Sequence, residues 1–168
     1  MKIGYEQSTS FLSWACRNLL ELSVIGKYVS ASEKNAKRFA DNQILDGIEL
    51  FKSLGAWSAG VQPQRQLPGL EQVLARLNGR KAKAGLTTTK VLRANELAKS
   101  VGMDTEFRHM NKVFSKTVHP TAWSVLTTLH EGELKRMKLF LFLSGVGYGM
   151  QIYTTLRSHI DRFGAKPA

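Results

Sequence analysis

Apolar residues recur at helical spacing along most of this chain, and this periodicity is the strongest constraint on its fold. From about Ser8 to Val29, an apolar stripe follows every third or fourth position and is widened on both sides by Phe11, Trp14 and Ile25. Such a pattern predicts a helix that packs at the centre of a bundle. No segment shows the alternation of apolar and polar residues that indicates a strand. The sequence therefore predicts an all-α protein.

Residues that start or stop helices predict where the others lie. Ser32 is a suitable N-cap for a second helix, for which Gly55 provides the stop, and His119-Pro120 ends a later helix. A helix is predicted over 32–54 and another from Leu70 to Asn78-Gly79, followed by a basic connector over 80–85. Further helices are predicted from Thr87–Thr89 to Val101 and from Asp104 to His119. Two last helices begin near Ala122 and near Glu131, and the second of these reaches Phe163.

The length and composition favour one ordered domain over residues 1–168. The chain has 168 residues, 43% of them hydrophobic, and only four prolines, which suits a folded domain rather than a disordered segment. The single cysteine, Cys16, lies in an apolar helical pattern and is expected to be a buried, unreactive thiol. Residues 1–10 lack the apolar core of a signal peptide, which favours a cytoplasmic location.

The C-terminal helix contains an uncharged stretch, Leu139–Leu156, of 18 positions. Its length reaches the lower limit for a membrane span, but Ser144 and Gln151 dilute its apolar character. Gly145 and Gly149 have a spacing that lets two helices approach closely, either within this chain or between two copies in a homodimer. We expect a single bundle of about five to seven helices in which this glycine-containing helix is buried.

The positive charge of the chain is concentrated in its middle. The net charge is +11, and residues 76–116 carry ten basic and three acidic side chains. Such a concentration favours a polyanionic partner, with RNA as the first candidate, although a solvated surface explains the charge equally well. A helix-turn-helix around Val91–Phe114 is a further alternative. The residues predicted to contact nucleic acid are Arg80, Lys81, Lys83, Arg108, Lys112 and Lys116.

Three polar residues are the candidates for chemistry. His119 ends a helix, and its imidazole suits general acid–base catalysis near neutral pH, although it could also simply cap the helix. Arg17 and Glu21 lie four residues apart and therefore share one helix face, where they could line a site or lock two helices together. No residue spacing predicts a metal site, and no phosphate loop or dinucleotide motif predicts a cofactor.

Two short passages carry a resemblance to known proteins. The Arg17-x3-Glu21 helix and the later Ser115-x3-His119-Pro120-Thr121 segment resemble a widespread family of uncharacterised helical bacterial proteins. That family is similar in turn to the HEPN bundles, many of which are ribonucleases of toxin–antitoxin and phage-defence systems. In HEPN enzymes four to six residues stand between the arginine and the histidine that follows it, whereas ten residues stand between Arg108 and His119 here.

The leading hypothesis is therefore a cytoplasmic helical bundle that binds or cleaves RNA without a metal, with His119, Arg17 and Glu21 at the catalytic site. In this hypothesis Arg17 replaces, from another helix, the arginine that the HEPN pattern places beside the histidine. The alternative is a noncatalytic protein-interaction bundle in which the same three residues are structural. A protein anchored to a membrane by Leu139–Leu156 is the third alternative.

Overall fold

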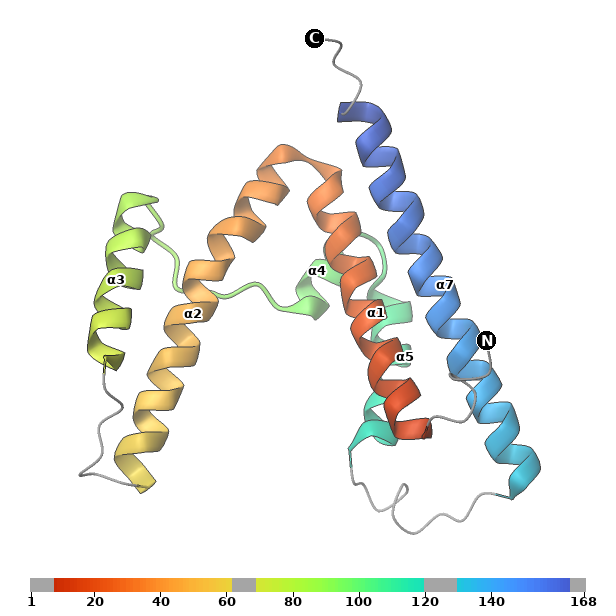
Figure 1. Ribbon diagram of the computed structural model, residues 1–168. Coiled ribbons are helices and arrows are strands. Elements are labelled where there is room, and N and C mark those ends of the chain that lie inside the picture. The colour runs from red at the N-terminus through yellow and green to blue at the C-terminus, as the bar shows by residue number, and fades with distance from the viewer. Residues whose placement is uncertain (1–7, 62–68, 120–129, 164–168) are drawn as a thin grey trace. The chain divides into compact units, whose positions relative to one another are not determined.

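The computed structural model describes residues 8–61, 69–119 and 130–163, and all its regular structure is helical. The described residues contain six helices and no strand, which confirms the predicted all-α class (Figure 1). They form two compact units, one with α1, α4, α5 and α7 and the other with α2 and α3. The helices are α1 Thr9–Ala31, α2 Glu33–Val61, α3 Leu70–Lys83, α4 Ala94–Ser100, α5 Asp104–Val118 and α7 Glu131–Phe163.

Helix α1 is the centre of its unit and contacts α4, α5 and α7. Its N-terminus is capped by Ser8, whose hydroxyl accepts a hydrogen bond from the backbone N–H of Phe11. The core of this unit contains the fully buried side chains of Leu20, Val24, Phe114 and Leu141. The predicted central helix is therefore present.

Helices α1 and α7 run side by side in the same direction (Figure 1). Cys16 is buried between them, and its thiol donates a hydrogen bond to the carbonyl of Leu141 at 2.9 Å. A Cβ atom added to Gly145 would lie 3.3 Å from the Cys16 sulfur, whereas one added to Gly149 would meet nothing within 4 Å. Gly145 therefore serves the contact within the chain, and Gly149 does not.

This asymmetry predicts opposite effects for two glycine substitutions in α7. Gly145→Leu should lower the free energy of unfolding by about 1–3 kcal/mol, because the added side chain overpacks the contact with α1. The matched change Gly147→Leu, at a glycine with open space around it, should raise stability by up to about 1 kcal/mol through helix propensity. Urea unfolding measures both, and equal effects of the two variants would contradict the close packing at Gly145.

The second unit consists of α2, α3 and the segment that follows α3. Ile44, Leu45 and Ile48 are buried side chains of α2. The buried side chain of Asn42 accepts a 2.7 Å hydrogen bond from the backbone N–H of Leu92, which ties this segment to α2. A cavity of about 750 Å³ lies along α2 and α3 within this unit.

Several predicted helix ends in this region are wrong. Helix α2 continues past Gly55 to Val61, and α3 continues past Asn78-Gly79 to Lys83, so most of the predicted basic connector is helical. Threonines 87–89 do not start a helix, because α4 begins only at Ala94. A glycine costs a helix about 1 kcal/mol, which packing can offset, and Gly55 lies directly against Leu70. The helix expected near Ala122 lies outside the described residues.

Helix α7 is buried on one face only. Leu141 and Tyr148 are buried, whereas large apolar side chains on the opposite face are exposed. Among the described residues, α7 is the one helix whose length and composition would allow it to cross a membrane. Only 11% of its most apolar 18-residue stretch is buried.

Candidate functional site

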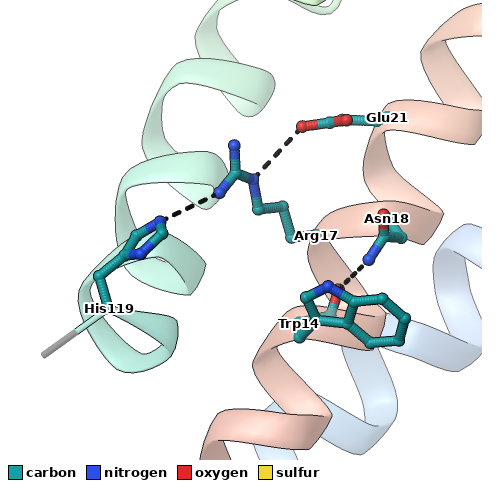
Figure 2. A network of polar contacts seen from close by, with 5 residues as sticks. All are labelled: Trp14, Arg17, Asn18, Glu21 and His119. Carbon is teal, nitrogen blue, oxygen red and sulfur yellow. Dashed lines mark hydrogen bonds and ion pairs between the residues drawn. The ribbon is translucent and has the colours of Figure 1, made fainter. Parts of the chain in front are cut away.

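Arg17, Glu21 and His119 lie together where the end of α5 meets α1 (Figure 2). The Nε atom of Arg17 donates a hydrogen bond to Oε1 of Glu21 at 3.3 Å, and Nη1 of Arg17 lies 3.4 Å from Nε2 of His119. The Arg17 and Glu21 side chains are 33% and 34% exposed, and His119 is exposed. The three predicted site residues thus converge on a surface that solvent can reach.

The end of α5 holds His119 in place. The helix stops at Val118, and His119 is the C-cap residue, with extended backbone angles (φ −89°, ψ 145°). Its backbone N–H donates a 3.1 Å hydrogen bond to the carbonyl of Ser115. The sequence prediction that the helix ends at this histidine is confirmed; Pro120 and Thr121 lie outside the described residues.

A partly buried hydroxyl pair fixes α1 against α5 next to this site. The side chain of Thr117 hydrogen-bonds to the side chain of Ser13, which has no exposed surface. Ser13 precedes Arg17 by one helical turn, and Thr117 precedes His119 by two residues, so this bond sets the register that brings Arg17 to His119. This pair is not predictable from the sequence, because one serine within an apolar helix gives no signal of its partner.

The Arg17–His119 contact orients the imidazole. A guanidinium has donors only, so the ring nitrogen that faces it is placed as the acceptor of the hydrogen bond. In this arrangement Nε2 of His119 faces Nη1 of Arg17. A ring nitrogen that accepts a hydrogen bond can also take up a proton, and here it lies next to a group that binds anions.

An exposed tryptophan lies beside the site. Trp14 is 53% exposed and lies one turn before Arg17 on α1 (Figure 2). Its ring centroid is 6.0 Å from that of Phe11. The carbonyl of Trp14 accepts a 2.8 Å hydrogen bond from the side chain of Asn18. An exposed ring can stack on a nucleic-acid base. The sequence pattern alone places Trp14 only on the apolar surface of its helix.

The six basic residues predicted to contact nucleic acid fall into two groups. Arg108, Lys112 and Lys116 are exposed and follow one face of α5 at intervals of four residues, leading toward His119. The others, Arg80, Lys81 and Lys83, are in α3, which belongs to the other compact unit.

Arg108 lies too far along α5 to contact His119. The two residues are separated by about 16 Å along the helix axis, at 1.5 Å per residue. The guanidinium of Arg108 instead pairs with the carboxylate of Asp104 at 3.3 Å, one turn earlier. Arg17 is thus the arginine that the structure brings to His119.

Comparison with known proteins places the chain in a family. Residues 14–135 match the profile of DUF5677, described as a family of unknown function. The chain belongs to the DUF5677 family. No curated protein and no solved structure matches it.

The DUF5677 match includes the complete polar site. Arg17, Glu21 and His119 all lie within residues 14–135, as does α5 with its basic face. This membership confirms the predicted link to an uncharacterised family.

Among the described residues, no group of three or more metal-binding side chains lies close enough to hold a metal ion. The thiol of Cys16 is 3% exposed, and burial raises its pKa, which keeps it protonated and unreactive. Burial, together with the charge of Glu106, also raises the pKa of Tyr148, whose ring meets that of Phe114 edge-on at 6.4 Å. Both residues therefore contribute to packing, which leaves the Arg17–Glu21–His119 group as the candidate site.

Proposed function

We propose that this protein binds single-stranded RNA along the exposed face of α5 and cleaves it at the Arg17–His119 site. The contact between Nη1 of Arg17 and Nε2 of His119 at 3.4 Å carries this proposal. It joins an anion-binding group to a ring nitrogen that can accept a proton, on a surface that solvent can reach.

Three surrounding features support RNA as the substrate. The basic face of α5, formed by Arg108, Lys112 and Lys116, can follow a phosphate backbone toward His119. Trp14 offers a ring on which a base can stack beside the cleavage site. The net charge of +11 strengthens attraction to any nucleic acid.

The chemistry requires only groups that the site and the substrate provide. Nε2 of His119 takes the proton of a ribose 2′-hydroxyl, and the 2′ oxygen attacks the adjacent phosphorus. The bond from phosphorus to the 5′ oxygen breaks, and the proton passes from the imidazolium to that leaving oxygen. Arg17 releases the imidazole and binds the phosphate oxygens on which negative charge develops. The products are a 2′,3′-cyclic phosphate and a free 5′-hydroxyl.

Glu21 acts in this scheme as a positioning residue. Its carboxylate accepts the hydrogen bond from Nε of Arg17, while Nη1 of the same guanidinium is directed toward His119. This division of roles agrees with the resemblance to HEPN ribonucleases, with the arginine supplied by α1 instead of by the helix of the histidine. A role in toxin–antitoxin or phage-defence systems belongs to the same proposal.

Paired substrates test this proposal directly. We expect the purified protein to cleave single-stranded RNA in the presence of EDTA and to leave 2′,3′-cyclic phosphate ends. The same RNA with 2′-O-methyl groups should remain intact, because it lacks the attacking hydroxyl, yet it should still bind with an affinity that falls steeply with salt. Cleavage of both substrates would contradict the mechanism, and salt-independent binding would contradict RNA as the partner.

A noncatalytic bundle is the second candidate, and one observation favours it. The hydrogen bonds of Arg17 connect α1 to the end of α5, which is also what a structural polar contact would do. In that case the protein does not cleave RNA, and replacement of His119 lowers the thermal stability.

A further inference from the structure

The exposed face of α7 carries an apolar seam that no described part of its own unit covers. Its large side chains are between 42% and 62% exposed, although the helix has a separate buried face against α1. The residues of the seam are Leu139, Phe142, Val146, Tyr153, Leu156 and Ile160, with Gly149 between the two central ones.

The spacing within the seam is that of a helix pair. Together with Gly149, the residues follow one another at alternating intervals of three and four positions, which is the heptad repeat of helices that pack with a left-handed twist. The seam extends for about 30 Å along the helix, at 1.5 Å per residue. A helix face that only contacts water is not expected to carry large apolar side chains in this repeat.

The exposed area is that of a standard protein interface. Side chains of this size, about half exposed, each present on the order of 100 Å². With the adjacent Leu143 and Met150, which are 58% and 56% exposed, the seam offers roughly 800 Å². One partner of a stable complex contributes about this much surface.

We propose that the seam is a homodimer interface, in which α7 packs antiparallel against α7 of a second copy. This inference does not depend on the proposed RNA cleavage. An antiparallel pair related by a two-fold axis places Gly149 opposite Tyr153 of the second copy, so that the large ring fills the space left by the glycine. The same register places Val146 opposite Leu156 and Phe142 opposite Ile160. The seam is thus complementary to itself.

The charges near the seam favour protein over lipid as its occupant. Arg157 and Asp161 form an ion pair at 3.2 Å beside the C-terminal end of the seam. Such pairs commonly flank the interfaces of packed helices, whereas burial in hydrocarbon would be costly.

A matched pair of charge substitutions tests the dimer. Light scattering on the full chain at micromolar concentration should give twice the 18.7 kDa mass of one chain. Val146→Glu adds a charge to an exposed position of the seam and should weaken dimerisation at least about 100-fold, with the helix content retained. Ser158→Glu adds the same charge to another exposed face of α7 and should leave the dimer intact.

Disulfide formation tests the orientation. A mixture of Phe142→Cys and Ile160→Cys proteins should form a mixed disulfide dimer, and neither protein should link efficiently to itself. Self-linking of Phe142→Cys would contradict the antiparallel arrangement. A wild-type chain that is monomeric in solution would overturn the proposal, whether the seam is then covered by the chain itself or binds lipid vesicles.

Discussion

Replacement of His119 by alanine should lower the rate of RNA cleavage about 100- to 10,000-fold, because it removes the proposed proton acceptor. His119 is exposed at the end of α5, so the variant should keep its helical circular dichroism and its unfolding midpoint. The control is His109→Ala, which removes an exposed histidine from the same helix and should cleave RNA at the wild-type rate.

A double-mutant cycle with Arg17 tests whether the two residues act as one unit. Arg17→Ala alone should lower the cleavage rate about 100- to 1,000-fold through the loss of phosphate stabilisation. The double variant should be little worse than His119→Ala, since groups that share one step are not additive. Two independent, multiplying losses would argue against the 3.4 Å contact as a functional pair. No cleavage by any form, with reduced stability of His119→Ala, would support the structural role instead.

Replacement of Phe114 by alanine should lower the free energy of unfolding by about 3–5 kcal/mol. The ring is fully buried and meets Tyr148 of α7 edge-on, so truncation leaves a cavity between α5 and α7. Because small proteins are stabilised by only about 5–15 kcal/mol, this one change removes a large share of the total. Urea unfolding, followed by circular dichroism, measures the loss.

The neighbouring residue provides the control for this measurement. Val113→Ala removes a side chain that is 38% exposed on the same helix and should change stability by no more than about 0.5 kcal/mol. If Phe114→Ala fails to fold, Phe114→Leu keeps most of the volume and should show a smaller loss. A loss below about 1 kcal/mol for Phe114→Ala would contradict its place in the core.

The helical class could be predicted from the sequence, but several helix ends could not. A glycine stops a helix reliably where the backbone needs a positive φ, as at Gly102, which has φ +73° and directly follows the predicted helix end at Val101. Gly55 has the same local signal, yet α2 continues through it, and Leu70 of α3 packs there, 2.9 Å from where a Cβ atom would lie. Only the tertiary contact distinguishes the two glycines. The described residues form two compact units, and this division does not test the prediction of a single domain.

The candidate site was predictable in its residues but not in its geometry. Helical spacing placed Arg17 and Glu21 on one face, and the His119-Pro120 pair marked the helix end. Their meeting depends on the Ser13–Thr117 contact between residues that are 104 positions apart, which no local pattern reveals. The apolar seam of α7 was equally hidden, because two apolar faces on one helix look like a single buried helix until the partner α1 is known.

The central position of α1 also has a consequence for the order of folding during synthesis. Helices α2 and α3 and the segment tied to α2 are complete once residue 92 has been made, so this unit can form early. Helix α1 is synthesised before α2 and α3 but packs against α4, α5 and α7, which follow residue 92. The apolar surface of α1 therefore has no packing partners until the residues after 92 have been made. Contacts between residues this distant in sequence also form slowly. Helix α1, which precedes the other described helices, is thus among the last of them to reach its native surroundings.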